Sequence, residues 1–311
     1  MSLSSIALFC CVDDFAQTYE EWERHKLVPS ARKRRRPGKL SLGESLFIIV
    51  LFHLSPFKDF KHLWIYGVEQ KYRDCFADFA SYGRFVSLMP RLMMPLCVLL
   101  QCFSGEQSGI YFVDSTKLSV CHNARNNRNK VFKGLAQRGR STMGWFFGFN
   151  LHMVINNKGE VMAIKVTAGN VDDRSPLKAM LKDITGKVFG DKGYICKPLF
   201  QELWHKGIQF ITGIRKNMKN YLMPIIDKGL LRKRFIIETV FDKLKTSMGL
   251  EHSRHRAPAN AFVHILSCIA AYMLGKTKVK MGPVTVTKTN QADRRSSIAL
   301  IQNSGKTAKA S

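Results

Sequence analysis

The sequence predicts an α+β or α/β fold, a mixed sheet flanked by helices, that follows an all-helical first segment. Up to about residue 105, apolar residues recur at steps of three and four, which is typical of helices. From about residue 108 the pattern changes to short β-branched and aromatic runs, the first of which precedes Asp114. Strand-like and helix-like segments alternate after that point, so we expect sheet and helices to pack together.

Individual elements follow from hydrophobic periodicity and from turn residues. The segment Asn156-Asn157-Lys158-Gly159 is a good hairpin turn between two strand-like runs. The predicted strands are 110–113, 145–155, 161–167, 188–190 and 208–211, and the predicted helices are 176–183, 198–205, 231–248 and 258–274.

The chain of 311 residues is long enough for two ordinary domains. We divide it into a helical domain over residues 1–105, a mixed domain over residues 106–275 and a tail over residues 276–311. The tail has eight Lys and Arg residues against one Asp, with much Thr, Ser and Asn, so we expect it to be loose.

The charge of the chain is strongly positive. Lys and Arg outnumber Asp and Glu by 49 to 23, which leaves a formal net charge of +26. A field of that size attracts polyanions, and nucleic acid is the natural partner. The alternatives are a basic protein kept soluble by its charge, or one attracted to an anionic membrane.

An unbroken basic run lies inside the first, helical segment and suits a phosphate backbone. The alternative is an ordinary solvated linker before a helix that begins near Ser41. The residues of this run are Arg32, Lys33, Arg34, Arg35 and Arg36.

Cysteine usage and hydropathy point to a cytoplasmic protein without a membrane partner. The eight cysteines form no CxxC pair, so we expect reduced thiols. His252 with His255, or Cys121 beside His122, could be zinc ligands, but no second pair with finger-like spacing completes a site, so we expect no zinc. The apolar stretches Leu46–Leu54 and Ala261–Leu274 are shorter than the roughly 20 residues that cross a bilayer, and we expect buried helices there. The first residues lack the basic region of a signal peptide.

Two carboxylates, Asp114 and Asp191, each follow a short apolar segment, which places both at strand ends. If those strands are neighbours, the two charges converge and resist joint ionisation unless cations lie between them. Magnesium fits, because it takes a few carboxylate oxygens and leaves room for phosphate oxygens. The alternative is that each Asp caps a turn.

A third carboxylate, Glu238, lies on a predicted helix with two clear faces. Arg234, Asp242 and Lys245 share its polar face, so this helix can pack on a sheet and present Arg, Glu and Lys together. The alternative is an exposed face with helical ion pairs, such as Arg234 with Glu238. The opposite, apolar arc consists of Ile236, Ile237, Val240, Phe241 and Leu244.

Three blocks together resemble a known family. They are Asp114-Ser-Thr, Gly190-Asp191-Lys-Gly-Tyr, and Arg234-x3-Glu238-x6-Lys245. They are similar to the catalytic blocks of bacterial insertion-sequence transposases with an RNase H-like DDE catalytic domain, and the resemblance covers residues 10–275. Many relatives have a Tyr three residues before the Arg, where this chain has Leu231.

The resemblance implies that Asp114, Asp191 and Glu238 are catalytic and hold two Mg²⁺ ions, with Mn²⁺ as a substitute. It implies metal-dependent DNA cleavage and strand transfer at insertion-sequence ends. Arg234 and Lys245 are then expected to hold DNA phosphates.

The same resemblance implies double-stranded DNA as the partner, with terminal inverted repeats and target DNA both bound, and a homodimer or larger assembly on DNA. We expect the helical first domain to bind the repeats. Two alternatives remain open: a DNA-binding relative that has lost catalysis, and an RNase H-like nuclease that cleaves DNA without strand transfer.

Overall fold

The computed structural model describes residues 3–25, 38–78, 80–141, 144–218, 222–251 and 255–282. The basic run from Arg32 to Arg36 lies outside the described residues, and so does the tail from residue 283 onward.

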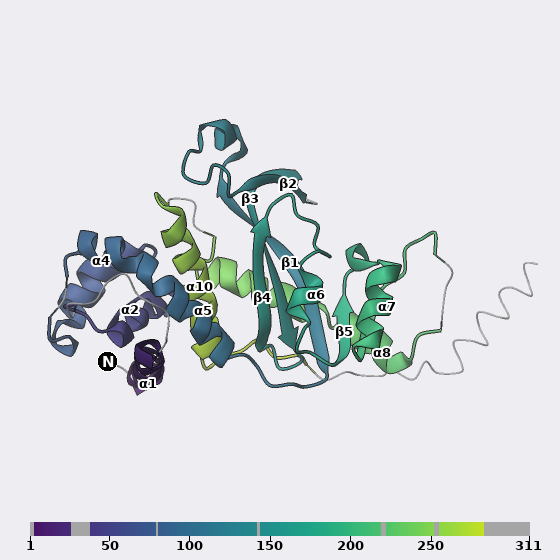
Figure 1. The fold of residues 1–311 in the computed structure, drawn as a ribbon, viewed down its shortest axis with the longest axis horizontal. Helices are drawn as coiled ribbons and strands as arrows, with labels where there is room; N and C mark the ends of the chain where they lie inside the picture. Colours follow the sequence, from purple (N-terminus) through teal and green to yellow (C-terminus); the bar gives the residue numbers. More distant parts are fainter. Residues whose placement is uncertain are drawn as a thin grey trace, which may run out of the picture.

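The first part of the chain is helical, as predicted (Figure 1). Its central helix, α2, begins after Ser41, whose side chain accepts a hydrogen bond from the Glu44 N–H while the Glu44 carboxylate accepts one from the Ser41 N–H. This reciprocal capping fixes the start of the helix. The helical elements are α1 (Leu3–His25), α2 (Leu42–Leu54), α3 (Phe60–His62), a π-helical segment (Leu63–Lys71), a 3₁₀ turn (Arg73–Cys75), α4 (Tyr82–Leu88), a second 3₁₀ turn (Met89–Leu92) and α5 (Met93–Cys102).

The second part is built on a mixed sheet, as predicted, but the sheet has six strands, one more than the sequence predicted, because β2 was not expected. The order is β2-β3-β1-β5-β6, and β4 also pairs with β3. β3 is antiparallel to β1, β2 and β4, whereas β1, β5 and β6 are parallel. The strands are β1 (Ile110–Cys121), β2 (Gln137–Ser141), β3 (Gly144–Asn156), β4 (Val161–Ala168), β5 (Gly186–Gly190) and β6 (Ile208–Thr212).

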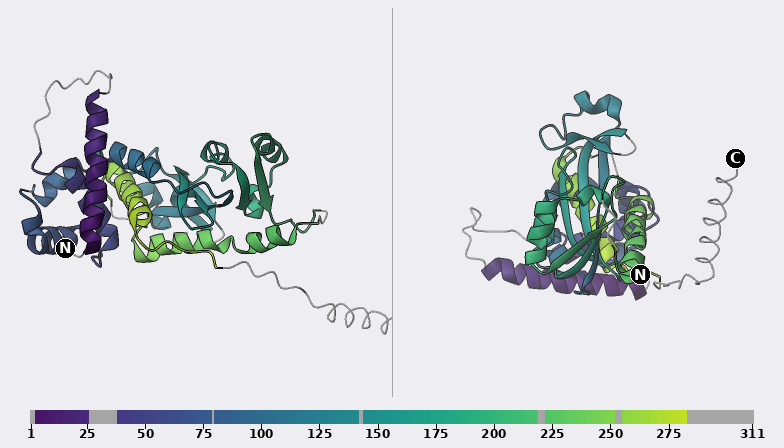
Figure 2. Two further views of the ribbon diagram at one scale, coloured as in Figure 1. Left: turned by 90° about the horizontal axis from the view of Figure 1, so that it is seen from below. Right: turned by 90° about the vertical axis from the view of Figure 1, so that its right-hand side faces the viewer.

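Helices cover both faces of this sheet. Figure 2 shows α8 (Ile225–Arg232) and α9 (Phe235–Asp242) along one face and α7 (Lys197–His205) on the other. α9 contacts β1, whereas α8 contacts β5 and β6. The remaining elements are α6 (Leu177–Met180), 3₁₀ turns at Asn123–Arg128 and Lys192–Tyr194, a π-helical segment (Lys243–Ser247) and α10 (Pro258–Leu274).

Two predicted helices differ in extent from the structure. The single helix expected over residues 231–248 is broken after Arg232, so α8 can cover β5 and β6 while α9 covers β1. Both pieces keep a helical apolar period, which is why the sequence pattern does not reveal the break. The helix expected over residues 176–183 is the four-residue α6.

One hydrophobic core runs from the helical part into the sheet. It contains Phe47 and Leu96 from the helices, Phe112 and Phe189 from the sheet, and Ile237 from α9. α10 packs against both α2 and α5, and this contact joins the two parts. Removing the helical part would expose this apolar surface to water.

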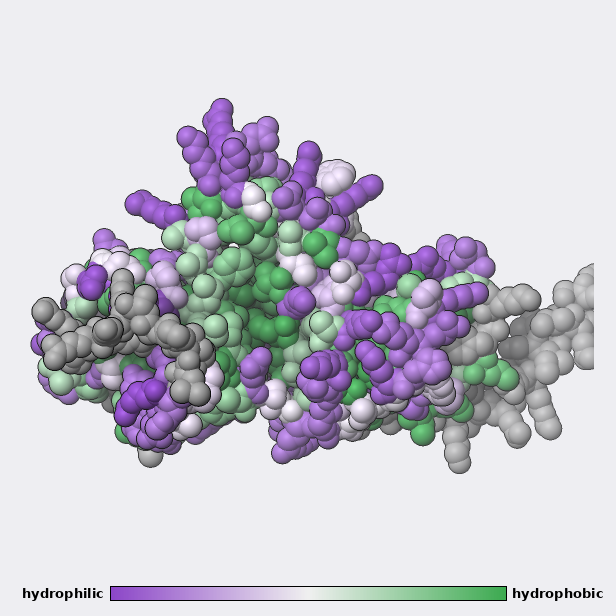
Figure 3. Space-filling view, viewed as in Figure 1, coloured by the Kyte–Doolittle hydropathy of each residue, from purple (hydrophilic) through white to green (hydrophobic). Residues whose placement is uncertain are grey.

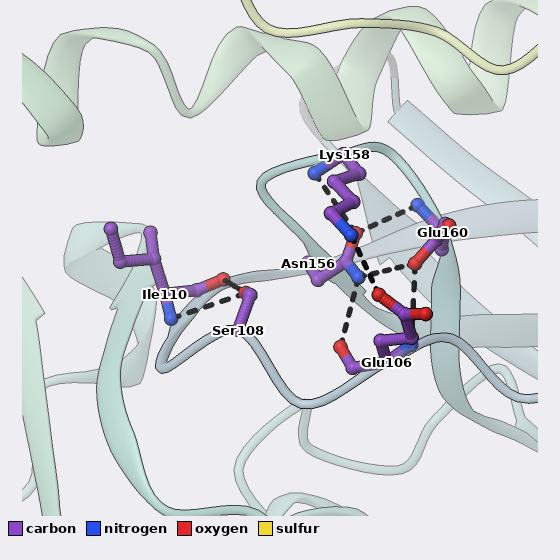
Figure 4. Close-up of polar contacts among 6 residues, drawn as sticks. All are labelled: Glu106, Ser108, Ile110, Asn156, Lys158 and Glu160. Atoms are coloured by element: carbon purple, nitrogen blue, oxygen red, sulfur yellow. Dashed lines mark hydrogen bonds and ion pairs between the residues drawn. The ribbon is translucent and has the colours of Figure 1, made fainter.

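The connection into β1 is held by the turn between β3 and β4 (Figure 4). The Asn156 amide donates to the Glu106 carbonyl (3.0 Å) and to a Glu160 carboxylate oxygen (2.7 Å), and Lys158 pairs with the Glu106 carboxylate (2.6 Å). Gly105 N–H donates to the Val161 carbonyl (2.9 Å). These bonds fix where β1 starts, and therefore where its later residues lie.

Among the described residues, one helical run, Tyr82–Cys102, is long and apolar enough to cross a membrane by length and composition. Sequence reasoning did not single it out. The run combines α4, a 3₁₀ turn and α5, and α5 packs along α10. The expectation of no membrane partner stays a prediction.

Residues 276–282, which the sequence assigns to the loose tail, pack back onto the mixed part of the structure. The Lys243 ammonium donates to the Thr277 carbonyl (2.6 Å), and Val279 N–H donates to the Tyr272 hydroxyl (3.3 Å). That hydroxyl donates to the Gly159 carbonyl (2.7 Å).

His53 joins the two parts of the structure. Its ring lies 2.7 Å (Nδ1) from the Met248 carbonyl oxygen and 2.9 Å (Nε2) from the Ser267 hydroxyl, and it is buried. Because the carbonyl can only accept, Nδ1 carries the proton. Burial, with a smaller effect of His264, lowers the pKa of His53 to about 3.

We predict that the free energy of unfolding falls as the pH is lowered from about 7 toward 4. The folded protein keeps His53 neutral, whereas the unfolded chain takes up a proton near pH 6.5, so acid favours unfolding. Urea unfolding at several pH values measures this. His53→Gln is expected to be less stable at pH 7 but to show a shallower pH dependence; an equally steep dependence would contradict the assignment.

Candidate active site

Asp114 and Asp191 lie at equivalent positions on neighbouring parallel strands. Phe112 of β1 pairs with Phe189 of β5, and each Asp follows its Phe by two residues. Successive side chains of a strand point to opposite faces, so residues two apart share a face. Both Phe side chains belong to the core beneath α9. The side chains of Asp114 and Asp191 therefore lie on the face of the sheet that α9 covers.

The two Asp residues differ in how their strands continue. Asp191 follows the last residue of β5, as predicted, and the 3₁₀ turn after it has no side-chain cap from Asp191. Asp114 is not at a strand end, because β1 continues to Cys121 and pairs Asp114 with Met153 of β3. That prediction was wrong: sequence alone did not show that Ser115–Cys121 would continue the ladder. The turn-cap alternative fails for both residues.

Gly190 permits the close packing before Asp191. A Cβ atom at this position would lie 2.7 Å from the Phe210 ring and 3.2 Å from a Val113 methyl carbon. A side chain there would push β5 away from its neighbours. The Gly before Asp191 thus helps to keep the two acidic positions side by side.

α9 packs its apolar arc against the sheet and keeps its polar face outward, as predicted. All five residues of its expected apolar arc are buried, whereas Glu238 is exposed and Arg234 half-buried. Arg234 stands at the N-terminal cap of α9, and Glu238 follows one turn later. The helix therefore directs a cation and a carboxylate toward Asp114.

Arg234 bridges two of the three carboxylates. One guanidinium nitrogen donates to Asp114 Oδ2 and another to Glu238 Oε1, each at 2.8 Å. The Asp114 and Arg234 side chains are each 21% exposed, so this pair is partly shielded from water, whereas Glu238 is 54% exposed. The helical pair of Arg234 with Glu238 is thus present, together with a second pair across the chain.

Burial raises the pKa of Asp114 to about 6. The Arg234 charge and the Ser115 N–H, which donates to Asp114 Oδ1 at 2.9 Å, act in the opposite direction. The charges of Glu238 and Asp191 raise the pKa further. A bound cation would relieve the repulsion that Glu238 and Asp191 exert on the buried Asp114 carboxylate.

Lys245, the other cation of the predicted set, also has protein partners. Its ammonium donates to the Lys117 carbonyl (2.8 Å) and lies 3.5 Å from the Glu251 carboxylate. The side chain is 22% exposed. Lys245 therefore connects the π-helical segment to β1, three residues beyond Asp114.

The carboxylate oxygens of Asp114, Asp191 and Glu238 fit a hard divalent cation by their chemistry. Among the described residues, however, no three His, Cys, Asp or Glu side chains are arranged so that they could hold a metal ion. The Arg234 guanidinium lies between Asp114 and Glu238 and supplies the positive charge there. A cation held by all three carboxylates requires Arg234 to withdraw.

Sequence reasoning gave no role to Tyr194, which is buried close to Asp114. Burial, followed by the Asp114 charge, raises the pKa of Tyr194, which keeps its hydroxyl protonated. Ser115, the residue after Asp114, is the side chain nearest to a hydrogen-bond partner for this hydroxyl. The position of Tyr194 in the Asp191-Lys-Gly-Tyr block was the signal that could have found it.

Comparisons with known proteins identify the part of the chain that carries this site. Residues 104–258 match the family described as "Transposase DDE domain". This is a DDE transposase. The matched segment contains all three carboxylates, Arg234 and Lys245.

Solved structures show low similarity to this DDE transposase. A piggyBac transposase synaptic complex with hairpin DNA has a TM-score of 0.44 and 10% identity, over 87% of this chain and 74% of that one. A Mos1 mariner paired end complex with Mn has a TM-score of 0.23 and 11% identity, over 89% and 98%. No curated protein sequence matches significantly.

Membership of this family sets the general activity. The transposase acts on DNA in transposition, as a nuclease and transferase, and DDE transposases use divalent metal ions. The roles of individual residues follow from the geometry and are proposed below.

We predict that Arg234→Gln tightens Mn²⁺ binding by several-fold, up to about tenfold, in the absence of DNA, because the cation no longer competes for Asp114 and Glu238. Calorimetric titration of the full-length transposase measures this. Arg232→Gln, on the exposed side of α8, makes the same charge change and is expected to leave the affinity unaltered. Weaker binding in Arg234→Gln would mean that Arg234 supports the ion site.

Proposed function

We propose that this transposase cuts DNA at the ends of its element and joins those ends to target DNA, with two Mg²⁺ ions held by Asp114, Asp191 and Glu238. Mn²⁺ substitutes for Mg²⁺ in this proposal. The observation that carries it is the register of β1 and β5 together with the bond from Arg234 to Asp114, which gather the acidic residues on one face.

The three carboxylates stand on different secondary-structure elements, and we assign their roles from those elements. Asp114 and Asp191 stand on adjacent strands of a buried sheet, so they provide the rigid side of the site. Glu238 stands on the exposed face of α9 and completes the site from a helix. Ions held by these residues would supply the Lewis acidity that activates an attacking water or 3′-hydroxyl and stabilises the leaving oxygen.

Arg234 exchanges partners in this proposal. Without metal or DNA it neutralises Asp114 and Glu238, and when cations take that role it is released toward the DNA phosphates. A planar guanidinium suits both partners, because carboxylate and phosphate offer similar pairs of acceptor oxygens. Lys245, close to the same edge of the sheet, contacts phosphate as a point charge.

The partners follow from the reaction. Terminal repeats and target DNA must both reach the site, and bringing two ends together requires a homodimer or larger assembly on DNA. We assign binding of the repeats to the helical part and the basic run. This part shares its core with the sheet, so its role is best tested by point substitutions in the full-length chain.

The three carboxylates, called the triad below, make a direct prediction. Asp114→Asn, Asp191→Asn and Glu238→Gln are each expected to lower metal-dependent nicking of DNA that carries the element's ends by about a thousandfold or more, because ion-held groups act as a unit. DNA binding is expected to persist. Gel-based nicking assays and binding titrations on the same proteins measure both.

Asp242→Asn is the matched control for the triad, since Asp242 lies one turn beyond Glu238 on the polar face of the same helix and is exposed. It should nick DNA as the parent does. Full nicking activity in all three triad variants would rule out the proposed site. Nicking by the parent without joining would indicate a nuclease rather than a transposase, and binding without nicking would indicate an inactive relative.

The basic run makes a separate prediction. Replacing all five residues from Arg32 to Arg36 with Ala should weaken binding of terminal-repeat DNA and lower the slope of log K against log salt by up to about five. Nicking at saturating DNA should be retained. Unchanged affinity and slope would show that this run is a solvated linker.

A further inference from the structure

A strongly basic excursion leaves the sheet between β1 and β3. This segment, the β1–β3 arm, comprises residues 122–141 and projects from the top of the molecule in Figure 1. It contains six Lys and Arg residues and no Asp or Glu. The cations are Arg125, Arg128, Lys130, Lys133, Arg138 and Arg140.

All six cations are exposed, and within the described residues none has a carboxylate partner among the ion pairs that the structure shows. Figure 3 shows hydrophilic side chains projecting from this end of the molecule. They differ in this respect from Arg234 and Lys245, whose charges are occupied by protein groups. Six like charges without counter-charges repel one another, and a polyanion would relieve that repulsion.

Packing and hydrogen bonds tie the arm to the rest of the structure. Phe132 is buried and meets the Phe149 ring of β3 edge to face, with ring centres 5.8 Å apart. The Asn129 side chain accepts a hydrogen bond from the Phe132 N–H (3.1 Å), and the Asn123 amide donates to the Trp145 carbonyl (2.6 Å). The cations are therefore presented from a fixed frame, which lowers the entropy that binding must overcome.

Two of the cations are oriented by an exposed aromatic ring. Trp145 is 50% exposed and pairs with Arg140 in the ladder of β2 and β3. The guanidinium carbons of Arg138 and Arg140 lie 4.9 and 5.9 Å from the Trp145 ring centre. Residues two apart on a strand share a face, so both Arg side chains leave β2 on one side. Stacking holds each guanidinium while its N–H donors remain available.

The arm also lies at a defined distance from the active site. It leaves β1 after Cys121, seven residues beyond Asp114, which is about 23 Å along an extended strand. That length corresponds to about seven base pairs of duplex DNA at 3.4 Å each. A duplex whose scissile phosphate lies at Asp114 therefore reaches the arm if it runs along β1.

We propose that the β1–β3 arm is a second DNA-binding surface, which grips the sugar-phosphate backbone of duplex DNA beside the segment that is cut. The inference rests on the proposed function for the position of the cut, but the binding itself needs neither metal nor catalysis. Since phosphate contacts carry no sequence information, the arm should bind any duplex sequence.

The test uses the full-length chain with EDTA present and a fluorescent duplex of arbitrary sequence, titrated at several salt concentrations. In the variant Arg125→Ala/Arg128→Ala/Lys130→Ala/Lys133→Ala we expect at least about tenfold weaker binding, and a slope of log K against log salt reduced by about one for each lost phosphate contact.

Two control variants separate a specific surface from net charge. Lys178→Ala/Lys182→Ala/Lys197→Ala/Lys206→Ala removes four exposed charges elsewhere and should bind nearly as the parent does. Arg125→Lys/Arg128→Lys/Lys130→Arg/Lys133→Arg keeps every charge on the arm and should also bind as the parent does. Equal losses in the two alanine variants, or no loss in the arm variant, would overturn the proposal. Parent-like binding with a smaller assembly in sedimentation would instead make the arm a contact between copies.

Failure of this inference is distinguishable from failure of the proposed function. Weak nicking by the arm variant should recover at saturating DNA, because its ion site is intact, whereas Asp114→Asn should remain inactive at any DNA concentration. Active Asp114→Asn would refute the proposed site and leave the binding result for the arm untouched.

Discussion

The burial of Asp114 next to two further carboxylates, Asp191 and Glu238, is the constraint on which this site depends. Asp114 and Asp191 are brought together by strand register, and Glu238 approaches on α9. Arg234 compensates part of the repulsion by bonding Asp114 and Glu238 at once. The site is therefore arranged around a positive charge, which the protein supplies itself in this structure.

The arrangement explains why the supporting structure is rigid on one side and adaptable on the other. β1 and β5 lie within the core, their neighbours closely packed around Gly190, and the β3–β4 turn fixes the entry into β1. Arg234 and Glu238, in contrast, are long side chains on a helix surface. The proposed exchange of Arg234 for a metal ion would therefore need side-chain rotation but no movement of the sheet.

Local patterns predicted much of this structure. Apolar runs predicted five of the six strands, all but β2, and the β3–β4 hairpin, and helical periodicity predicted both faces of α9. What escaped prediction depends on contacts distant in sequence: the extension of β1 beyond Asp114, the break between α8 and α9, and the bond from Arg234 across 120 residues to Asp114. The charged residues of the β1–β3 arm can be read in the sequence, but the packing that places them on one projecting segment cannot.

The central claim is that the three carboxylates hold divalent ions once Arg234 gives way. Anomalous diffraction from crystals of the full-length transposase grown with Mn²⁺ tests it most directly. The account predicts manganese peaks within about 2.0–2.5 Å of carboxylate oxygens of Asp114, Asp191 and Glu238, with the guanidinium turned away. Manganese bound elsewhere, with Arg234 still bridging Asp114 and Glu238, would contradict it.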